Sequence, residues 1–264
     1  MNEIKLFRLL KTFSFALLCV ISYQTYAYDH LAVTIEGTLE DVRREFERLG
    51  SEQWRYEGSE AGRLIFSRNG IGFIEVFGGY RYDLDTIGEA ETVQQLLDRH
   101  GDRGDLYLGF NRNYAIFLKP NPQGVYPYRY LAASFNADQA PDGIPAKFME
   151  LGRQGWQFTG QIGTQLIFRQ TSPFDQYAAT IQTEWQNDLP ALVRQLGNEG
   201  WGYLGEGASY HVFSNNLPHA HEIVKRPDDA ESLEAFLAAS PRMRFRGSSD
   251  SYLIFADSIF FPTD

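Results

Sequence analysis

The chain has 264 residues, a formal net charge of −10, 43% hydrophobic residues and one cysteine. This length allows one large domain or two ordinary domains with a substantial core. The acidic balance disfavours nucleic acid and anionic lipid as partners, and a single cysteine excludes an internal disulfide or a thiolate metal cluster.

Residues 1–27 have the pattern of a secretory signal peptide. Three basic residues precede an apolar stretch at residues 13–21, and the small residues Thr25 and Ala27 stand where a signal peptidase would cut. The apolar stretch is well short of the roughly 20 residues that span a bilayer. We therefore expect residues 28–264 to be a thiol-free repeat domain without a transmembrane segment, periplasmic or secreted.

Five nine-residue segments of the chain share one pattern, with glycine first and Ile or Val followed by Phe last. They are Gly58–Phe66, Gly109–Phe117, Gly160–Phe168, Gly205–Phe213 and Gly247–Phe255. We interpret each as a hairpin in which the glycine and the polar residues after it form the turn. The constant step predicts that the five phenylalanines occupy equivalent buried positions.

A short strand and a helix are predicted before each hairpin. The strand candidates are residues 31–37, 72–78, 129–135, 177–183 and 221–226. Apolar positions three and four apart predict helices with buried faces at Val42/Phe46/Leu49, Val93/Leu97/His100, Ile144/Phe148/Leu151, Leu189/Val193/Leu196 and Leu233/Phe236/Leu237.

The boundaries of these helices also have sequence signals. Asp188 with Pro190, and Asp228 or Asp229, are typical of helix starts. Glycines directly after four of the helix faces are predicted to close the helices in a left-handed conformation: Gly50, Gly101, Gly152 and Gly197.

The predicted fold is α+β, with five tandem strand-helix-strand-strand units. Their bounds are about 30–68, 71–119, 128–170, 177–215 and 219–257. A unit with one helix cannot bury both faces of its sheet, so the units must pack on one another. The adjacent apolar residues that end each hairpin indicate a strand covered on both faces, by its own helix on one side and by a neighbouring unit or a partner protein on the other.

An LGxxGW pattern follows the helices and resembles a small bacterial domain family of unknown function. The matching residues are Leu49, Gly50 and Trp54; Leu151, Gly152, Gly155 and Trp156; and Leu196, Gly197, Gly200 and Trp201. Three positions depart from it, at Gln53, Asp105 and Met243. The resemblance implies a fold and carries no activity.

The number and order of the units resemble a circularly shifted form of the five-bladed α/β-propeller of arginine deiminase and its relatives. Those enzymes work through a cysteine that residues 28–264 lack, so the resemblance implies shape and not catalysis. The alternative is a split at the proline-rich residues 119–129 into two lobes of two and three units.

Sequence motifs for catalysis are absent: there is no phosphate-binding glycine loop, dinucleotide fingerprint, nucleophile elbow or HExxH. We therefore predict no catalytic residue, cofactor or metal ligand. His219 and His221 could share one strand face but lack an evident third ligand, and His211 stands at a leucine position of the repeat, as a core histidine would. The acidic pair Asp83 and Asp85 is interpreted as helix-capping or surface residues.

Other stretches have weaker interpretations. Arg103, Gly104 and Asp105 spell an adhesion tripeptide, which recurs by chance. Five tyrosines in loop-like stretches are interpreted as rings that cover strand ends, with sugar stacking or an interface as the alternative. They are Tyr80, Tyr82, Tyr126, Tyr128 and Tyr130.

The second unit differs from its sisters at two apolar positions. His100 replaces the helix-face leucine and Asp105 replaces the tryptophan, with Arg103 between them. The three residues are either a local structural cluster, or a helix end open to solvent, or the lining of a ligand site. The functional hypothesis is an exported, non-enzymatic repeat protein that presents a binding surface to a protein or polysaccharide partner, with His100, Arg103 and Asp105 at the site. The alternative is a hydrolase that uses carboxylate or histidine residues.

Overall fold

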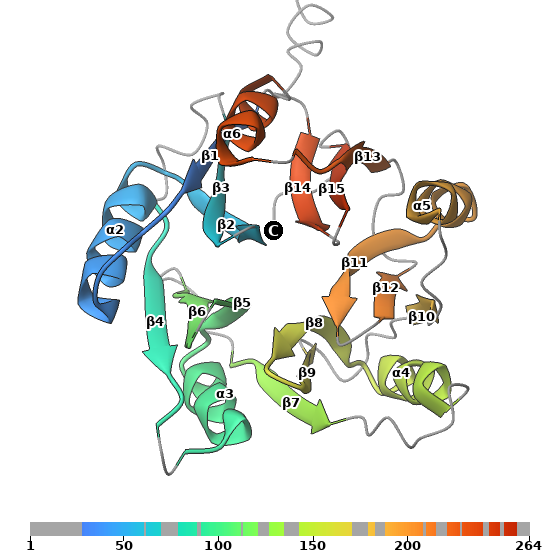
Figure 1. Ribbon diagram of the computed structural model, residues 1–264. Helices are drawn as coiled ribbons and strands as arrows, with labels where there is room; N and C mark the ends of the chain where they lie inside the picture. The colour runs from blue at the N-terminus through green and yellow to red at the C-terminus, as the bar shows by residue number, and fades with distance from the viewer. Residues whose placement is uncertain are drawn as a thin grey trace, which may run out of the picture.

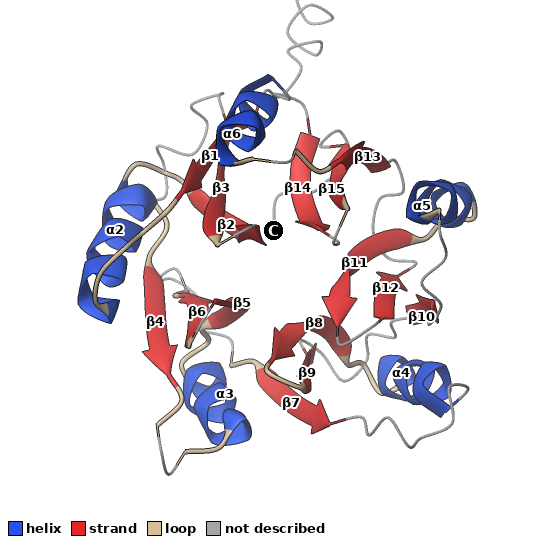
Figure 2. Cartoon of the chain, viewed as in Figure 1, coloured by secondary structure: helices blue, strands red, loops and turns tan. Residues whose placement is uncertain are grey.

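The computed structural model describes residues 28–60, 62–69, 79–88, 91–111, 113–120, 127–134, 143–170, 179–182, 188–207, 210–214, 221–227, 229–239, 243–248 and 251–257. The predicted leader, residues 1–27, lies outside these residues. The described part of the chain forms five units that lie in a ring (Figure 1). Strands occupy the inside of the ring and helices its outer rim (Figure 2).

Each unit has the predicted order of strand, helix, strand, strand. The helices are α2 (Leu39–Ser51), α3 (Val93–Asp102), α4 (Gly143–Arg153), α5 (Leu189–Asn198) and α6 (Ala230–Ala239). The strands of the first three units are β1 (Tyr28–Val33), β2 (Arg55–Glu60), β3 (Arg63–Asn69), β4 (Tyr82–Thr86), β5 (Leu106–Asn111), β6 (Tyr114–Leu118), β7 (Arg129–Ser134), β8 (Gln157–Ile162) and β9 (Gln165–Gln170). Those of the last two are β10 (Ala179–Gln182), β11 (Gly202–Gly207), β12 (Tyr210–Ser214), β13 (His221–Lys225), β14 (Met243–Ser248) and β15 (Tyr252–Asp257).

The three strands of every unit form a separate antiparallel sheet in which the third strand lies in the middle. The fold class is therefore α+β, as predicted. In the second unit the first strand is β4, and the predicted strand at 72–78 lies outside the described residues. Tyr82 and Leu84 of β4 are buried at alternate positions, which is the period of a strand with one covered face.

The helix starts follow the predicted capping chemistry. Asp188 is the N-cap of α5, and its side chain accepts a hydrogen bond from the backbone N–H of Ala191. Asp229 accepts one from the N–H of Ser232 at the start of α6, at 2.7 Å. Thr38 and Thr92 form reciprocal capping boxes at α2 and α3.

The predicted role of the helix-exit glycines is wrong. Gly50 lies inside the last turn of α2, and the left-handed residue is Gln53, with φ 67°. In the next three units the left-handed residues are Gly104, Gly155 and Gly200. Gly50 is needed for a close approach instead: its carbonyl accepts a hydrogen bond from the N–H of Tyr80, and a Cβ would stand 2.1 Å from the Tyr80 carbonyl oxygen.

The glycine that begins each nine-residue segment lies inside the inner strand and not in the turn, which corrects the second glycine prediction. In β2 the pairing with β3 shifts between Tyr56 and Gly58, which forms a β-bulge, and the other inner strands shift at the same place. An aromatic ring of the preceding unit covers each glycine, 3.1 to 3.8 Å from where a Cβ would stand. The pairs are Phe245 on Gly58, Tyr56 on Gly109, Tyr107 on Gly160, Phe158 on Gly205 and Tyr203 on Gly247.

The core lies between successive units. Phe46 and Phe66 of the first unit share a cluster with Ile116 of the second, whereas Ile65 packs with Phe245 of the fifth. Adjacent residues of β3 thus cover opposite faces of one sheet, which confirms the prediction of a strand buried on both sides. The five repeat phenylalanines are all buried, as predicted: Phe66, Phe117, Phe168, Phe213 and Phe255.

A hydroxyl group links two pairs of neighbouring units. Tyr82 of β4 accepts a hydrogen bond from the N–H of Tyr56 and donates one to the carbonyl of Trp54, both at 2.8 Å. Tyr130 of β7 does the same for Tyr107 and Asp105.

Among the described helices, none has the length and apolar character that crossing a bilayer requires.

Candidate functional site

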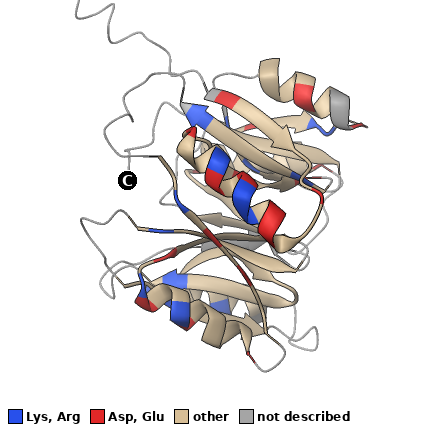
Figure 3. Cartoon of the chain, turned by 90° about the vertical axis from the view of Figure 1, so that its left-hand side faces the viewer, with Lys and Arg blue, Asp and Glu red and all other residues tan. Residues whose placement is uncertain are grey.

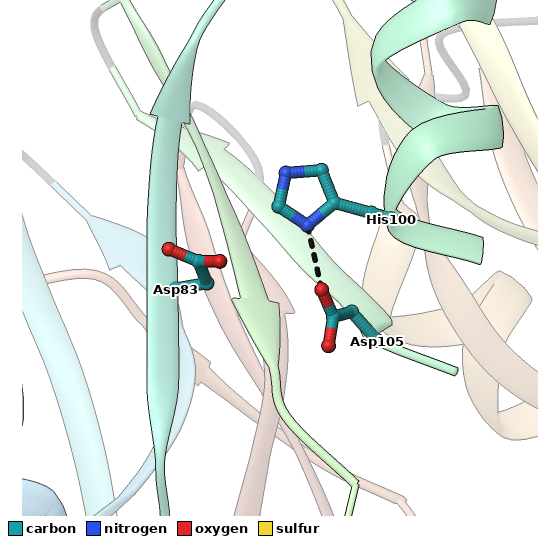
Figure 4. A group of neighbouring side chains, drawn as sticks. All are labelled: Asp83, His100 and Asp105. Atoms are coloured by element: carbon teal, nitrogen blue, oxygen red, sulfur yellow. Dashed lines mark hydrogen bonds and ion pairs between the residues drawn. The ribbon is translucent and has the colours of Figure 1, made fainter. Parts of the chain in front are cut away.

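The last turn of α3 and the start of β5 bring the three predicted site residues together. His100 is fully buried, and its ring is stacked on that of Phe117 with 3.6 Å between centroids. Its Nδ1 lies 2.9 Å from Oδ2 of Asp105 (Figure 4). The helix exit therefore holds a polar pair at the positions where three of the sister units have leucine and tryptophan.

Arg103 connects this pair to solvent. Its guanidinium donates to Asp105 through Nε at 3.0 Å and to Asp83 through Nη2 at 3.2 Å. The Arg103 side chain is 48% exposed, whereas those of His100 and Asp105 are 0% and 4% exposed. Of the three predicted site residues, only Arg103 can reach a ligand without movement of the fold.

The sequence interpretation missed the contribution of β4. Asp83 receives Arg103 and lies 3.7 Å from Nζ of Lys119, and Asp85 pairs with Arg99 at 2.6 Å. The two aspartates alternate with Tyr82 and Leu84 in β4, so they lie on the face of the strand opposite these buried side chains. That alternation was a usable signal, but the predicted first strand was elsewhere.

Both nitrogens of the imidazole face carboxylates of the chain itself. Nδ1 faces Asp105 and Nε2 lies 3.4 Å from Oδ2 of Asp85. A neutral ring carries one N–H, so each tautomer donates to one of the two carboxylates. With hydrogen on Nδ1 the ring donates to Asp105; with hydrogen on Nε2 it donates to Asp85 while Nδ1 accepts from Arg103 at 2.7 Å. In neither case is a ring nitrogen directed at solvent.

The charges of the site follow from burial and pairing. Burial lowers the pKa of His100 below 6.5, and the charge of Arg103 acts in the same direction, although Asp105 and Asp83 oppose the shift. Burial alone would raise the pKa of Asp85, but its bonds to Arg99 and His100 outweigh burial and hold the pKa below 3.8. The imidazole is therefore neutral at pH 7 among charged neighbours.

The donor set could suit a metal ion in its chemistry. One ligand atom each of Asp83, His100 and Asp105 lies within 4.8 Å of the others, and imidazole with carboxylates is a ligand set used by zinc. However, Nη2 of Arg103 lies within 3.2 Å of one such atom on all three residues. The guanidinium takes the position of a cation, so the residues do not fit a metal while Arg103 remains there.

The other histidines and the tripeptide have structural positions. Nε2 of His221 accepts a hydrogen bond from the N–H of Tyr203 at 3.0 Å, which links the fourth and fifth units. His211 is buried, as expected for a core histidine, and His219 lies outside the described residues. Asp105 of the adhesion tripeptide is buried, at 3% exposure, which leaves Arg103 as its accessible charged side chain.

The loop-like tyrosines also have positions in the fold. Tyr82 and Tyr130 are buried inter-unit links. Tyr80 and Tyr128 pack at the edge of the hydrophobic core clusters, and Tyr126 lies outside the described residues.

Comparison of the chain with family models, with curated proteins and with solved structures found no match.

Proposed function

We propose that the chain is an exported, non-enzymatic repeat protein that presents a binding surface to a protein or polysaccharide partner, with the helix exit of the second unit at its centre. We also infer that the five units close as a five-bladed α/β-propeller rather than separate into two lobes. The fold inference concerns shape, and the functional proposal concerns the one unit whose polar residues break the repeat.

Repeated contacts that return from the last unit to the first support the closed form. The innermost strands β2, β5, β8, β11 and β14 each contact the next, and β14 contacts β2. Every helix also contacts the first strand of the following unit, including α6 with β1. In a two-lobed chain, the first and last units would not make the contact that every other pair of neighbouring units makes.

One observation carries the non-enzymatic proposal: the imidazole of His100 is fully buried and both its nitrogens face carboxylates of the chain. A general base needs a nitrogen within hydrogen-bond reach of its substrate. Arg103, by contrast, is half exposed and held in place by two carboxylates, as a binding group would be.

The exposed groups around Arg103 favour a polar partner. Asp83, Arg99 and Lys119 have side chains 25% to 43% exposed, and together they offer fixed donors and acceptors. Both signs of charge are also interspersed on the outer helices at this side of the ring (Figure 3). Among the described residues, Met149 is the large apolar side chain that is exposed, and it lies on α4 of the third unit. Hydroxyl groups of a glycan or polar protein side chains therefore suit the surface around Arg103 better than an apolar ligand.

Affinity capture with purified residues 28–264 tests the proposal, with envelope extract of the source and its isolated polysaccharide as probes. The variant His100→Leu with Asp105→Trp restores the repeat pattern, and we expect it to lose the captured partner while its melting temperature holds or rises. Arg44→Ala on α2, an exposed arginine of the first unit, is the matched control and should retain the partner. Capture that survives in the folded double variant would place the binding surface elsewhere. If the unchanged protein hydrolyses the polysaccharide and the double variant does not, the hydrolase alternative is supported instead.

A further inference from the structure

A second charged cluster lies where the last unit meets the first. Arg55 and Glu57 share one face of β2, and Arg244 and Arg246 share one face of β14. Nε of Arg244 lies 3.0 Å from Oε2 of Glu57. The two strands are neighbours at the inside of the ring (Figure 1). The cluster is separate from the second unit and uses none of its residues.

Glu57 is the shared partner of the three arginines. Burial alone would raise the pKa of this carboxyl, but Arg244, Arg55, Ser67 and Arg246 together outweigh burial and lower it. The Glu57 side chain is 6% exposed and also accepts a hydrogen bond from Ser67 Oγ at 2.6 Å. One carboxylate therefore faces three guanidinium groups, in a chain whose overall charge is negative.

Arg55 has a hydrogen-bond donor that the cluster leaves unused. Its Nε is buried and has no hydrogen-bond partner among the described residues, and its distance to Glu57 Oε1 is 4.0 Å. The Arg55 side chain is 36% exposed, so the guanidinium reaches solvent while one donor stays covered. A buried donor without a partner is costly, and a ligand oxygen would relieve that cost.

We propose that Arg55, Arg244 and Arg246 form an anion site at the interface of the first and last units, which takes one carboxylate or phosphate group. Guanidinium groups bind planar and tetrahedral oxyanions through paired N–H donors, which suits this cluster better than a neutral ligand. Glu57 contacts Arg244 at 3.0 Å and neutralises part of the positive charge, and the bound group would complete the hydrogen bonds of Arg55. Binding at this interface would also hold the first and last units together.

Titration calorimetry and thermal melts with inorganic phosphate and with a trigalacturonate oligosaccharide test the site, at ionic strength matched with sodium chloride. We expect saturable binding of at least one probe, and which probe binds tells a phosphate source from a carboxylate source. Arg55→Gln should weaken binding about tenfold or more, as the loss of a charged hydrogen bond does. Arg44→Gln, on the outer helix α2, should bind as the unchanged protein does.

A second variant tests the site through a gain of binding, which a folding defect cannot produce. Glu57→Gln removes the competing carboxylate, so it should bind the anion more tightly, and the anion should raise its melting temperature more than that of the unchanged protein. The proposal would be overturned if Arg55→Gln bound the anion as tightly as the unchanged protein does. It would also be overturned if neither probe bound saturably.

Discussion

The ring of Phe245, near the end of the chain, lies 3.1 Å from where a Cβ on Gly58 would stand. The same relationship joins Tyr56 to Gly109 at 3.5 Å, one unit further along. An aromatic residue two positions before the glycine of one unit thus packs on the glycine of the next. At Gly58 the contact favours glycine, because a Cβ there would press against the Phe245 ring.

We predict that Gly58→Ala destabilises the protein by about 1 to 3 kcal/mol, because it adds a Cβ against Phe245 at a strained backbone angle of φ +154°. Urea unfolding measures the change. Gly109→Ala is the matched control at the same bulge position, where the added Cβ would make an ordinary 3.5 Å contact with Tyr56. Equal costs at the two glycines would show that the ring contact does not decide the residue.

We predict that Tyr82→Phe costs about 1 to 3 kcal/mol, because it leaves the buried N–H of Tyr56 and carbonyl of Trp54 without their partner. Tyr130→Phe should cost a similar amount, since its hydroxyl links the second and third units in the same way. The double variant should show nearly additive losses, as distant sites do. Unchanged unfolding midpoints in both single variants would mean that the hydroxyl groups do not hold the units together.

Much of the fold could be predicted from the repeat, but its contacts could not. The step from glycine to phenylalanine fixed which rings are buried, because a strand register cannot shift without exposing them. The bulge at Gly58 could not be predicted, because Phe245, the ring that packs on it, is distant in sequence. Local turn propensity and a tertiary contact both favour glycine, and the sequence alone does not tell them apart.

The candidate site was partly predictable for the same reason. His100 and Asp105 interrupt an apolar pattern, so their proximity followed from the sister units. Asp83 and Asp85 were interpreted as helix-capping or surface residues, because nothing in the sequence shows that β4 faces the exit of α3. The burial of His100 could not be predicted either, because it depends on how Phe117 and Arg103 cover its ring.

We predict that His100 makes the protein less stable as the pH falls below about 6.5. Burial lowers the pKa of His100 in the folded chain, so the unfolded chain takes up a proton near pH 6.5 that the folded chain does not. The contribution of the neutral ring is complete above that pH and decreases as the pH falls toward the folded pKa. His211 acts in the same direction because of its own burial.

Urea unfolding of the unchanged protein and of His100→Leu, from about pH 7.5 to 5.5, isolates this contribution. The stability of the unchanged protein should decrease relative to that of the variant as the pH falls. Lowered pKa values of Glu57 and Asp85 affect stability only below their ordinary values of 4.5 and 3.8, outside this range. Two parallel stability curves would contradict a neutral, buried His100.

Closure of the five units into one ring is tested most directly by a cross-link between the first and the last. Arg63 of β3 and Glu234 of α6 form an ion pair at 2.5 Å, and the chain outside the predicted leader has no cysteine. We predict that Arg63→Cys with Glu234→Cys is joined within one molecule by a short bismaleimide, as seen by mass spectrometry of a protease digest. Lys147→Cys with Glu234→Cys, which lie on helices in different parts of the ring (Figure 1), should stay unlinked. If the two cysteines of the first pair are each modified but never joined to one another, in a folded protein, the closed ring is contradicted.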